Sequence, residues 1–197
     1  MGADVVGTEL GTKYFGPEVG RYVGLASGLL AGAAAYGGLD ILDREVNFTG
    51  AYPKATSTLT DFDFKGNTLK DVKVEDLEYI KRDRAEYNMM RNEFNKSVKP
   101  EFLKTLAETH EADLKAAGLT DENIANMAAG KGVKGYSVHH IVPLDDSGTN
   151  DPSNLVLIDE ASHQIPTNYQ LSFCKSISVG SSKTISWPYF DQSLYLK

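Results

Sequence analysis

The sequence predicts an α+β protein in which a helical N-terminal and middle region precedes two short strands and a helix. Between residues 74 and 129, apolar side chains recur at three- and four-residue spacing, which is the period of a helix. After Gly130, short apolar runs alternate with loops rich in Asp, Ser, Gly and Asn, which is typical of strands and turns. The 197 residues include 41% hydrophobic and 24% charged side chains, a composition typical of folded globular domains.

Residues 1–45 are rich in glycine and alanine, and the stretch 22–39 within them carries no formal charge. Three glycines recur there at every fourth position: Gly24, Gly28 and Gly32. Such a ridge of small residues lets two helices approach closely. One interpretation is a glycine-repeat helix packed against its own protein, and the other is a segment that contacts a membrane during delivery. Residues 46–73 are polar and are interpreted as a linker with room for a short hairpin.

Residues 74–129 are predicted to form a helical region packed on the C-terminal part of the chain. The residues that follow helical spacing in the first helix are Leu77, Ile80, Arg84, Tyr87, Met90 and Phe94. Pro100 is expected to end this helix. A second helix is predicted over residues 101–117, and a third over 121–129, with Thr120 as its N-cap. The basic residues of the first helix alternate with acids, so they are interpreted as a solvated surface.

Charge and cysteine content restrict the class of function. The net charge of −7 argues against a protein that binds nucleic acid over its whole surface. Most of the acidity lies in residues 1–129, with 21 acids and 15 bases, whereas residues 130–197 hold 6 acids and 5 bases. Cys174 is the single cysteine, which excludes an internal disulfide and a cysteine-based zinc cluster. A standard secretory signal is not evident, so we expect any export to use a specialised apparatus.

Three of the four histidines, His139, His140 and His163, fall close together in the C-terminal part. Neighbouring residues of a strand point to opposite faces, so His139 and His140 are suited to different tasks. One can face a metal ion while the other faces a water molecule. The second is suited to act as a general base, because an imidazole has a pKa of about 6.5. Asn154, on the returning arm of the loop, can orient that base, and His163 can complete the metal site.

The run His139-His140-Ile-Val-Pro-Leu, a loop with glycine, the run Ser-Asn154-Leu-Val-Leu-Ile and the later His163 resemble the HNH, or His-Me finger, nuclease superfamily. The resemblance covers about residues 130–170 and implies a ββα core around one divalent metal ion. It implies His139 and His163 as metal ligands and His140 as the general base. It also implies that Asn154 stabilises the loop and orients the base.

The sequence departs from many members of this superfamily at one position. They carry a further histidine four residues after the last one, where this chain has Thr167. Asn168 follows directly and is a candidate ligand or supporting residue. Imidazole ligands favour zinc, whereas an open, hydrated site also suits magnesium or manganese, so the identity of the metal stays open.

The order of segments resembles the toxin end of bacterial polymorphic toxins, including type VI secretion effectors and Rhs-type tips. A glycine-rich segment and a helical region precede a nuclease module and tail over residues 130–197. The resemblance implies a fragment of a larger parent chain that a delivery apparatus carries into a competing bacterium. There it would degrade DNA in the cytoplasm, and a cognate immunity protein would neutralise it in the producer.

The sequence therefore predicts a metal-dependent endonuclease that acts on DNA with little sequence preference, because its contacts would be mainly to the phosphate backbone. An RNase is one alternative. A second is a degenerate HNH module that binds nucleic acid or a partner without cleavage, although the complete His-His-Asn-His set argues against it. A third is a toxin that acts on membranes through residues 22–39.

Overall fold

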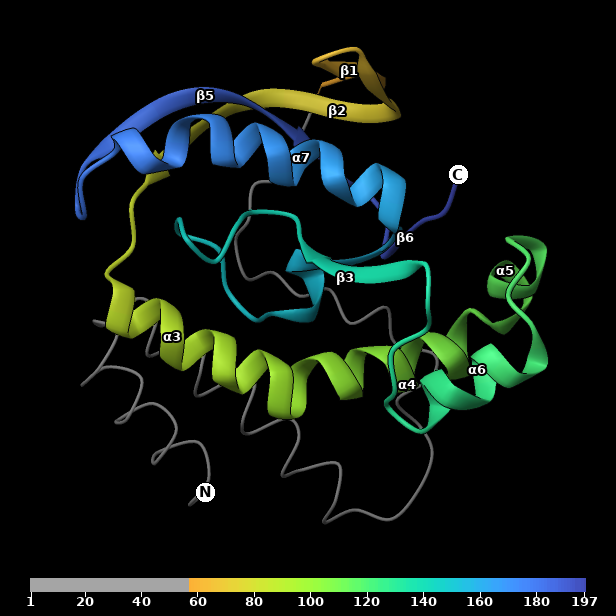
Figure 1. The fold of residues 1–197 in the computed structure, drawn as a ribbon. Helices are drawn as coiled ribbons and strands as arrows, with labels where there is room; N and C mark the ends of the chain where they lie inside the picture. The colour runs from red at the N-terminus through yellow and green to blue at the C-terminus, as the bar shows by residue number, and fades with distance from the viewer. Residues whose placement is uncertain (1–56) are drawn as a thin grey trace. The chain divides into compact units, whose positions relative to one another are not determined.

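A computed structural model describes residues 57–197, which form two three-stranded sheets and a set of helices (Figure 1). The glycine-repeat segment and residues 46–56 of the predicted linker lie outside the described residues. Within 57–197, no helix has both the length and the apolar character that crossing a membrane requires. The mixture of helices and sheets agrees with the predicted α+β class.

The described chain begins with a hairpin of β1 (Thr60–Phe64) and β2 (Asn67–Ile80). The two residues between the strands, Lys65 and Gly66, have φ values of 51° and 80°, which fit the primed turns that join twisted strands. β2 also pairs with β5 (Ser182–Tyr189), so the sheet order is β1-β2-β5. The short hairpin for which residues 46–73 leave room is therefore present from residue 60 onward, but the interpretation of these residues as a linker is wrong, because the hairpin is part of a three-stranded sheet.

The prediction of a helix beginning at residue 74 is also wrong, because β2 continues to Ile80. Leu77 and Tyr79 are buried, whereas Ile80 is 42% exposed, which is the two-residue alternation of a strand. Leu77, Ile80 and the later apolar residues are spaced as in a helix, and this spacing led to the prediction. The helix begins only after Asp83, whose carboxylate accepts hydrogen bonds from two backbone N–H groups of the first turn.

One continuous helical run follows, made of α3 (Arg84–Glu93), a π-helical turn (Phe94–Val98) and α4 (Lys99–Thr109). Pro100 does not end the helix as predicted. It lies in the first turn of α4, directly after the π-helical turn. The wider turn accommodates the proline, which has no N–H group to donate to the helix. Figure 1 shows this run crossing the lower side of the fold.

The predicted second helix is divided at His110 into α4 and α5 (Glu111–Ala116). The predicted third helix is confirmed as α6 (Asp121–Ala128). Thr120 caps it as expected, and the Asn123 side chain returns a bond to the Thr120 backbone, which completes a capping box.

The predicted pair of strands and the helix after them are confirmed. β3 (Tyr136–His140) pairs antiparallel with β4 (Leu155–Asp159), and α7 (Glu160–Phe173) follows at once. The Asp159 carboxylate accepts from the backbone N–H of Ser162 and starts this helix. Pro166 lies inside α7, which continues past it to Phe173. β6 (Leu194–Tyr195) adds a parallel strand to β4.

α7 lies between the two sheets, and the α3–α4 run covers the other side of β3 (Figure 1). A buried apolar cluster joins α4, α5 and α6 to the β3–β4 hairpin. Its largest members are Phe94, Phe102, Leu103, Leu106, Leu114, Met127, Leu155 and Leu157. The helical middle region is therefore part of the same core that holds the strands carrying the histidines.

Candidate active site

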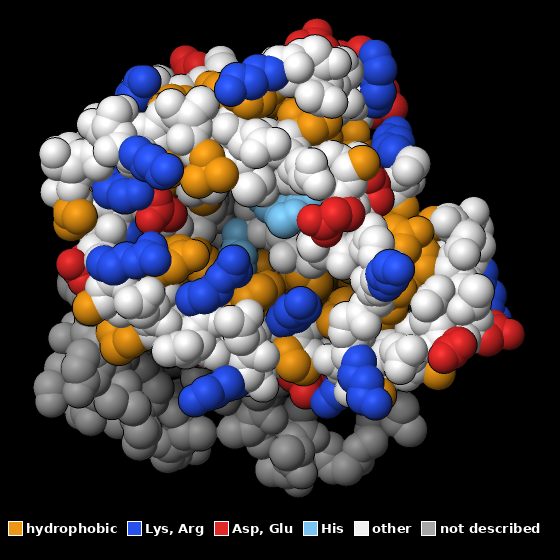
Figure 2. Space-filling model, in the orientation of Figure 1, with side chains coloured by type: hydrophobic (Ala, Val, Ile, Leu, Met, Phe, Trp, Pro, Cys, Tyr) orange, Lys and Arg blue, Asp and Glu red, His pale blue; other side chains and the backbone are white. Residues whose placement is uncertain are grey.

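β3 ends at His139 and His140. Figure 2 shows a hollow in the surface in which histidine side chains lie among apolar, basic and acidic ones. Both residues are buried, with 8% and 6% exposure. The His139 ring faces α7, and its centroid lies 5.1 Å from that of His163. The His140 ring faces the opposite helical run, with its centroid 4.5 Å from that of Phe94. The strand thus directs the two histidines to different faces, as expected from its geometry.

His139 has the features of a metal ligand. Its Nε2 atom is buried and has no hydrogen-bond partner among residues 57–197, which is costly for a polar atom without a ligand. Burial, with a smaller contribution from the neighbouring His163, holds the pKa of His139 well below its ordinary value. The ring is therefore neutral at pH 7 and keeps a lone pair, which is the form that binds a metal ion.

His163, in the first turns of α7, is the second imidazole of this pair. Its Nδ1 atom lies 3.8 Å from a carboxylate oxygen of Glu160, and its Nε2 atom lies 3.4 Å from the hydroxyl of Thr167. The other carboxylate oxygen of Glu160 accepts a hydrogen bond from Ser137 at 2.9 Å, which fixes the carboxylate beside the ring. Burial lowers the pKa of His163, and the charge of Glu160 opposes this shift.

The residues present fit a divalent ion held by His139 and His163. In the described part of the chain, no three or more His, Cys, Asp and Glu side chains are placed so that together they could hold a metal ion. Two imidazoles would therefore leave several coordination positions to solvent and phosphate oxygens. Such an open arrangement is typical of catalytic rather than structural metal sites.

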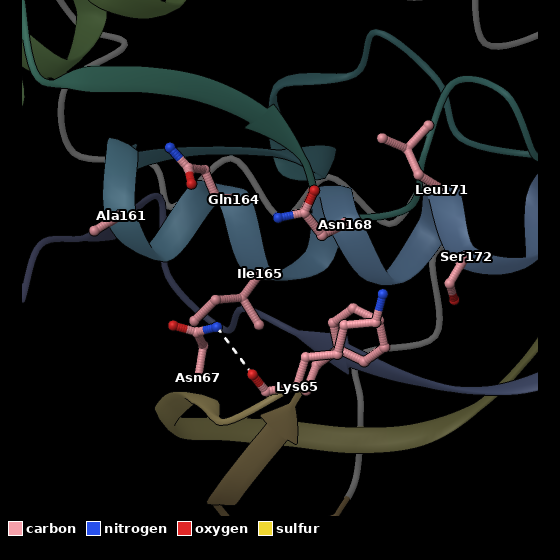
Figure 3. Close-up of a pocket in the computed structure, with 9 residues that line it drawn as sticks. Lys65, Asn67, Ala161, Gln164, Ile165, Asn168, Leu171 and Ser172 are labelled. Carbon is pink, nitrogen blue, oxygen red and sulfur yellow. Dashed lines mark hydrogen bonds between the residues drawn. The ribbon is translucent and has the colours of Figure 1, made fainter.

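Asn168 lies on a different part of the α7 surface from His163, about 140° around the helix for five residues. It lines a cavity of about 460 Å³ with Gln164. Figure 3 shows both side chains on α7, across from Lys65 and Asn67 of the β1–β2 turn. The side chain that the structure brings to the His163 ring is Thr167, and not Asn168.

His140 is held by a residue that the sequence did not indicate. Its Nε2 atom lies 3.1 Å from the Oδ1 atom of Asn150, and the Nδ2 atom of Asn150 donates to the backbone oxygen of Met90 and to Glu93, both at 2.9 Å. Burial is the main cause that lowers the pKa of His140 to about 4. No local pattern could have identified Asn150, because its α3 partners lie 57 and 60 residues away in the sequence.

Asn154 is 1% exposed and is fully engaged with the backbone of the loop. Its Oδ1 atom accepts from the Val142 N–H at 2.8 Å, and its Nδ2 atom donates to the carbonyls of Val142 and Thr149 at 3.0 and 2.9 Å. These bonds close the loop between the two strands. The amide that contacts the His140 ring is that of Asn150, so the two tasks predicted for Asn154 fall on two asparagines in the structure.

Arg82 fixes the same loop from outside. Its guanidinium is buried and donates to the carbonyls of Leu144, Asp146 and Gly148 at 2.7, 2.7 and 2.8 Å. It was interpreted as part of a solvated helix surface, which is wrong because it precedes α3 and points inward. Gly148 is required by a close approach, since a Cβ atom there would lie 2.0 Å from the carbonyl oxygen of Val142.

Arg91 supplies a positive charge at the edge of the hollow. It is exposed on α3, and its guanidinium lies 5.4 Å from the centroid of the Phe94 ring. Its charge contributes to lowering the pKa of His139, His140 and His163, so it lies within electrostatic range of all three. Figure 2 shows further Lys and Arg side chains below and to the sides of the histidines, together with an acidic side chain beside one of them. A phosphate group at the histidines would therefore be attracted electrostatically.

Comparison with known proteins agrees with this arrangement. Residues 130–167 match the family model of HNH endonucleases, and this range contains His139, His140, Asn154 and His163. The uncharacterized protein YhhZ of Escherichia coli (strain K12) is 34% identical over 184 residues, or 93% of this chain. The chain spans about half of that relative's length, 46%. No solved structure matches this chain significantly. The match to the HNH endonucleases indicates nuclease activity for this part of the chain.

Proposed function

We propose that the chain is a metal-dependent endonuclease that hydrolyses phosphodiester bonds of DNA with little sequence preference. The observation that carries the proposal is the buried, unpartnered Nε2 atom of His139 beside His163, with His140 on the opposite face of the same strand. This pairing of a ligand position with a separate basic group is what in-line phosphodiester hydrolysis needs.

His139 and His163 would hold the ion, which when bound would stabilise negative charge on the phosphate and on the leaving oxygen. His140 has a pKa of about 4, so it is neutral at pH 7 and able to accept the proton of the attacking water. The loop closed by Asn154 holds the end of β3 in place, which keeps both histidines in one orientation.

Low sequence preference is proposed because the charges around the site suit phosphate groups rather than base edges. Arg91 can bind a phosphate oxygen next to the histidines, and a contact of this kind fixes the position of the nucleic acid without identifying its bases. The net charge of the whole chain is −7, so attraction to the substrate depends on this local cluster.

The test is cleavage of supercoiled plasmid by the purified full chain with magnesium, manganese or zinc, and with EDTA. We expect the wild type to cut, His140→Ala to lose activity, and EDTA to abolish it. His110→Ala is the matched control, because His110 lies at the exposed break between α4 and α5. Equal activity of the wild type and His140→Ala would refute the assignment of the base.

An RNA substrate in the same assay distinguishes the nearest alternative. Cleavage of RNA alone would change the proposed substrate and keep the chemistry. Binding of DNA or RNA by a folded protein that cuts neither with any metal would replace the proposal with a degenerate, non-cleaving HNH module.

We also propose that the nuclease acts as an antibacterial toxin in the cytoplasm of a competing cell, after delivery by a specialised apparatus, and that an immunity protein neutralises it in the producer. The order of segments in the sequence supports this part. Induced expression in a bacterium should stop growth and fragment the chromosome, and His140→Ala should relieve both effects. Growth arrest that persists in His140→Ala with intact DNA would instead favour action on membranes through residues 22–39.

A further inference from the structure

The amide of Asn150 makes three hydrogen-bond contacts, and together they fix which way it faces. Its nitrogen lies 2.9 Å from the Met90 carbonyl oxygen and 2.9 Å from a carboxylate oxygen of Glu93. Its oxygen lies 3.1 Å from the Nε2 atom of His140. A carbonyl and a carboxylate can only accept hydrogen bonds, so both hydrogens of the amide nitrogen are used on the α3 side.

The reverse orientation of this amide is unfavourable, because it would place the Asn150 oxygen against two other acceptors. The oxygen must therefore face His140, and an oxygen of an amide only accepts. It follows that the Nε2 atom of His140 carries the hydrogen of that bond. A neutral imidazole has one N–H group, so its Nδ1 atom is left with the lone pair.

We propose that Asn150 is the positioning residue for His140: held by α3, it fixes the tautomer protonated at Nε2 and makes Nδ1 the atom that accepts the proton of the attacking water. The kinetic part of this inference rests on the proposed nuclease function, whereas the assignment of the tautomer does not.

The packing around His140 supports a fixed ring. Phe94 stands with its centroid 4.5 Å from the centroid of the imidazole, at an angle of 54°, and limits rotation about the side-chain bonds. Met90, Glu93 and Phe94 all belong to the α3 run, outside the residues that match the HNH endonucleases. The orientation of the base is therefore set by a helix that the motif does not include.

The tautomer can be read directly by NMR. The full chain, with ¹⁵N-labelled histidine, is measured near neutral pH in EDTA, and His140 is assigned by the signals lost in His140→Ala. We expect Nε2 to give a protonated, pyrrole-type shift and Nδ1 an unprotonated, pyridine-type shift. Asn150→Ala should lose this preference. Asn150→Asp should not restore it, because the carboxylate cannot donate to the Met90 carbonyl and Glu93 as the amide nitrogen does. Asn92→Ala, an exposed asparagine of the same helix, is the control and should match the wild type.

Kinetics on the same variants test the consequence for the reaction. Loss of a group that orients a general base should lower kcat by at least about tenfold, with KM changed by less than about twofold. Protonation of His140 at Nδ1 in the wild type, or an Asn150→Ala variant with unchanged tautomer and kcat, would overturn the proposal. The expected tautomer in a protein that cleaves no nucleic acid would support the positioning by Asn150 and refute the nuclease.

Discussion

Replacing Asn154 with alanine tests how the loop between β3 and β4 is held. The side chain makes three hydrogen bonds to loop backbone, at 2.8, 2.9 and 3.0 Å, and is 1% exposed. Alanine removes all three bonds and leaves the N–H of Val142 and the carbonyls of Val142 and Thr149 without that partner. It also leaves a small void where the amide was.

The size of the effect follows from the number of bonds. A typical buried hydrogen bond contributes about 1 kcal/mol net, and an unsatisfied buried group costs about 1–3 kcal/mol. Three bonds in one buried position therefore predict a loss of about 3–5 kcal/mol in the free energy of unfolding. Asn150→Ala should cost less, because Asn150 is only partly buried and water can replace the amide.

Urea unfolding of the two variants, with Asn92→Ala as the control, measures this difference. We expect Asn154→Ala to lose cleavage activity together with stability, since its side chain bonds to the loop rather than to the His140 ring. An Asn154→Ala protein with wild-type stability and no activity would refute this reasoning and show that Asn154 takes part in the chemistry directly.

Three further perturbations have defined outcomes. Gly148→Ala should destabilise the protein to urea by about 1–3 kcal/mol, since the new Cβ would meet the Val142 carbonyl oxygen; wild-type stability would contradict the close approach. Arg91→Ala should raise KM for DNA by about tenfold at low salt, whereas Arg84→Ala on the same helix should not; equal effects would indicate general attraction only. Burial raises the pKa of Asp146 from 3.8 to about 6. Protonation of Asp146 therefore stabilises the folded state fully below pH 3.8, and this contribution is lost as the pH rises through about 6. Relative to Asp146→Asn, the wild type should lose up to about 3 kcal/mol of unfolding free energy across that range, and parallel pH profiles would refute the assignment.

The parts of the site that the sequence could predict are those encoded locally. His139 and His140 lie on β3, and His163 lies on α7, which follows the hairpin partner β4 directly. These elements are close in sequence and have their own turn and cap signals, and the polar loop before the apolar run at Asn154 indicated the hairpin. A short, contiguous unit of this kind carries most of its own information.

The parts that could not be predicted depend on distant partners. Arg82 and Asn150 each bond to residues at least 57 positions away, and nothing near either residue indicates those bonds. Residues 74–80 of β2 were predicted as a helix because Leu77 and Ile80 are three residues apart, which matches a helical period, whereas their pairing with β5 near the C-terminus makes them a strand. The π-helical turn before Pro100 likewise has no sequence signal of its own.

The position of Arg82 determines how much chain must travel with the nuclease motif if it is moved to another protein. A transplant cut at Gly130 would carry the histidines but not the guanidinium that binds three loop carbonyls. It would also lack the acceptors that hold Asn150. A chimera that begins before Arg82 keeps both sets of bonds, so the transferable unit must include α3 and extends well to the N-terminal side of the 130–167 match.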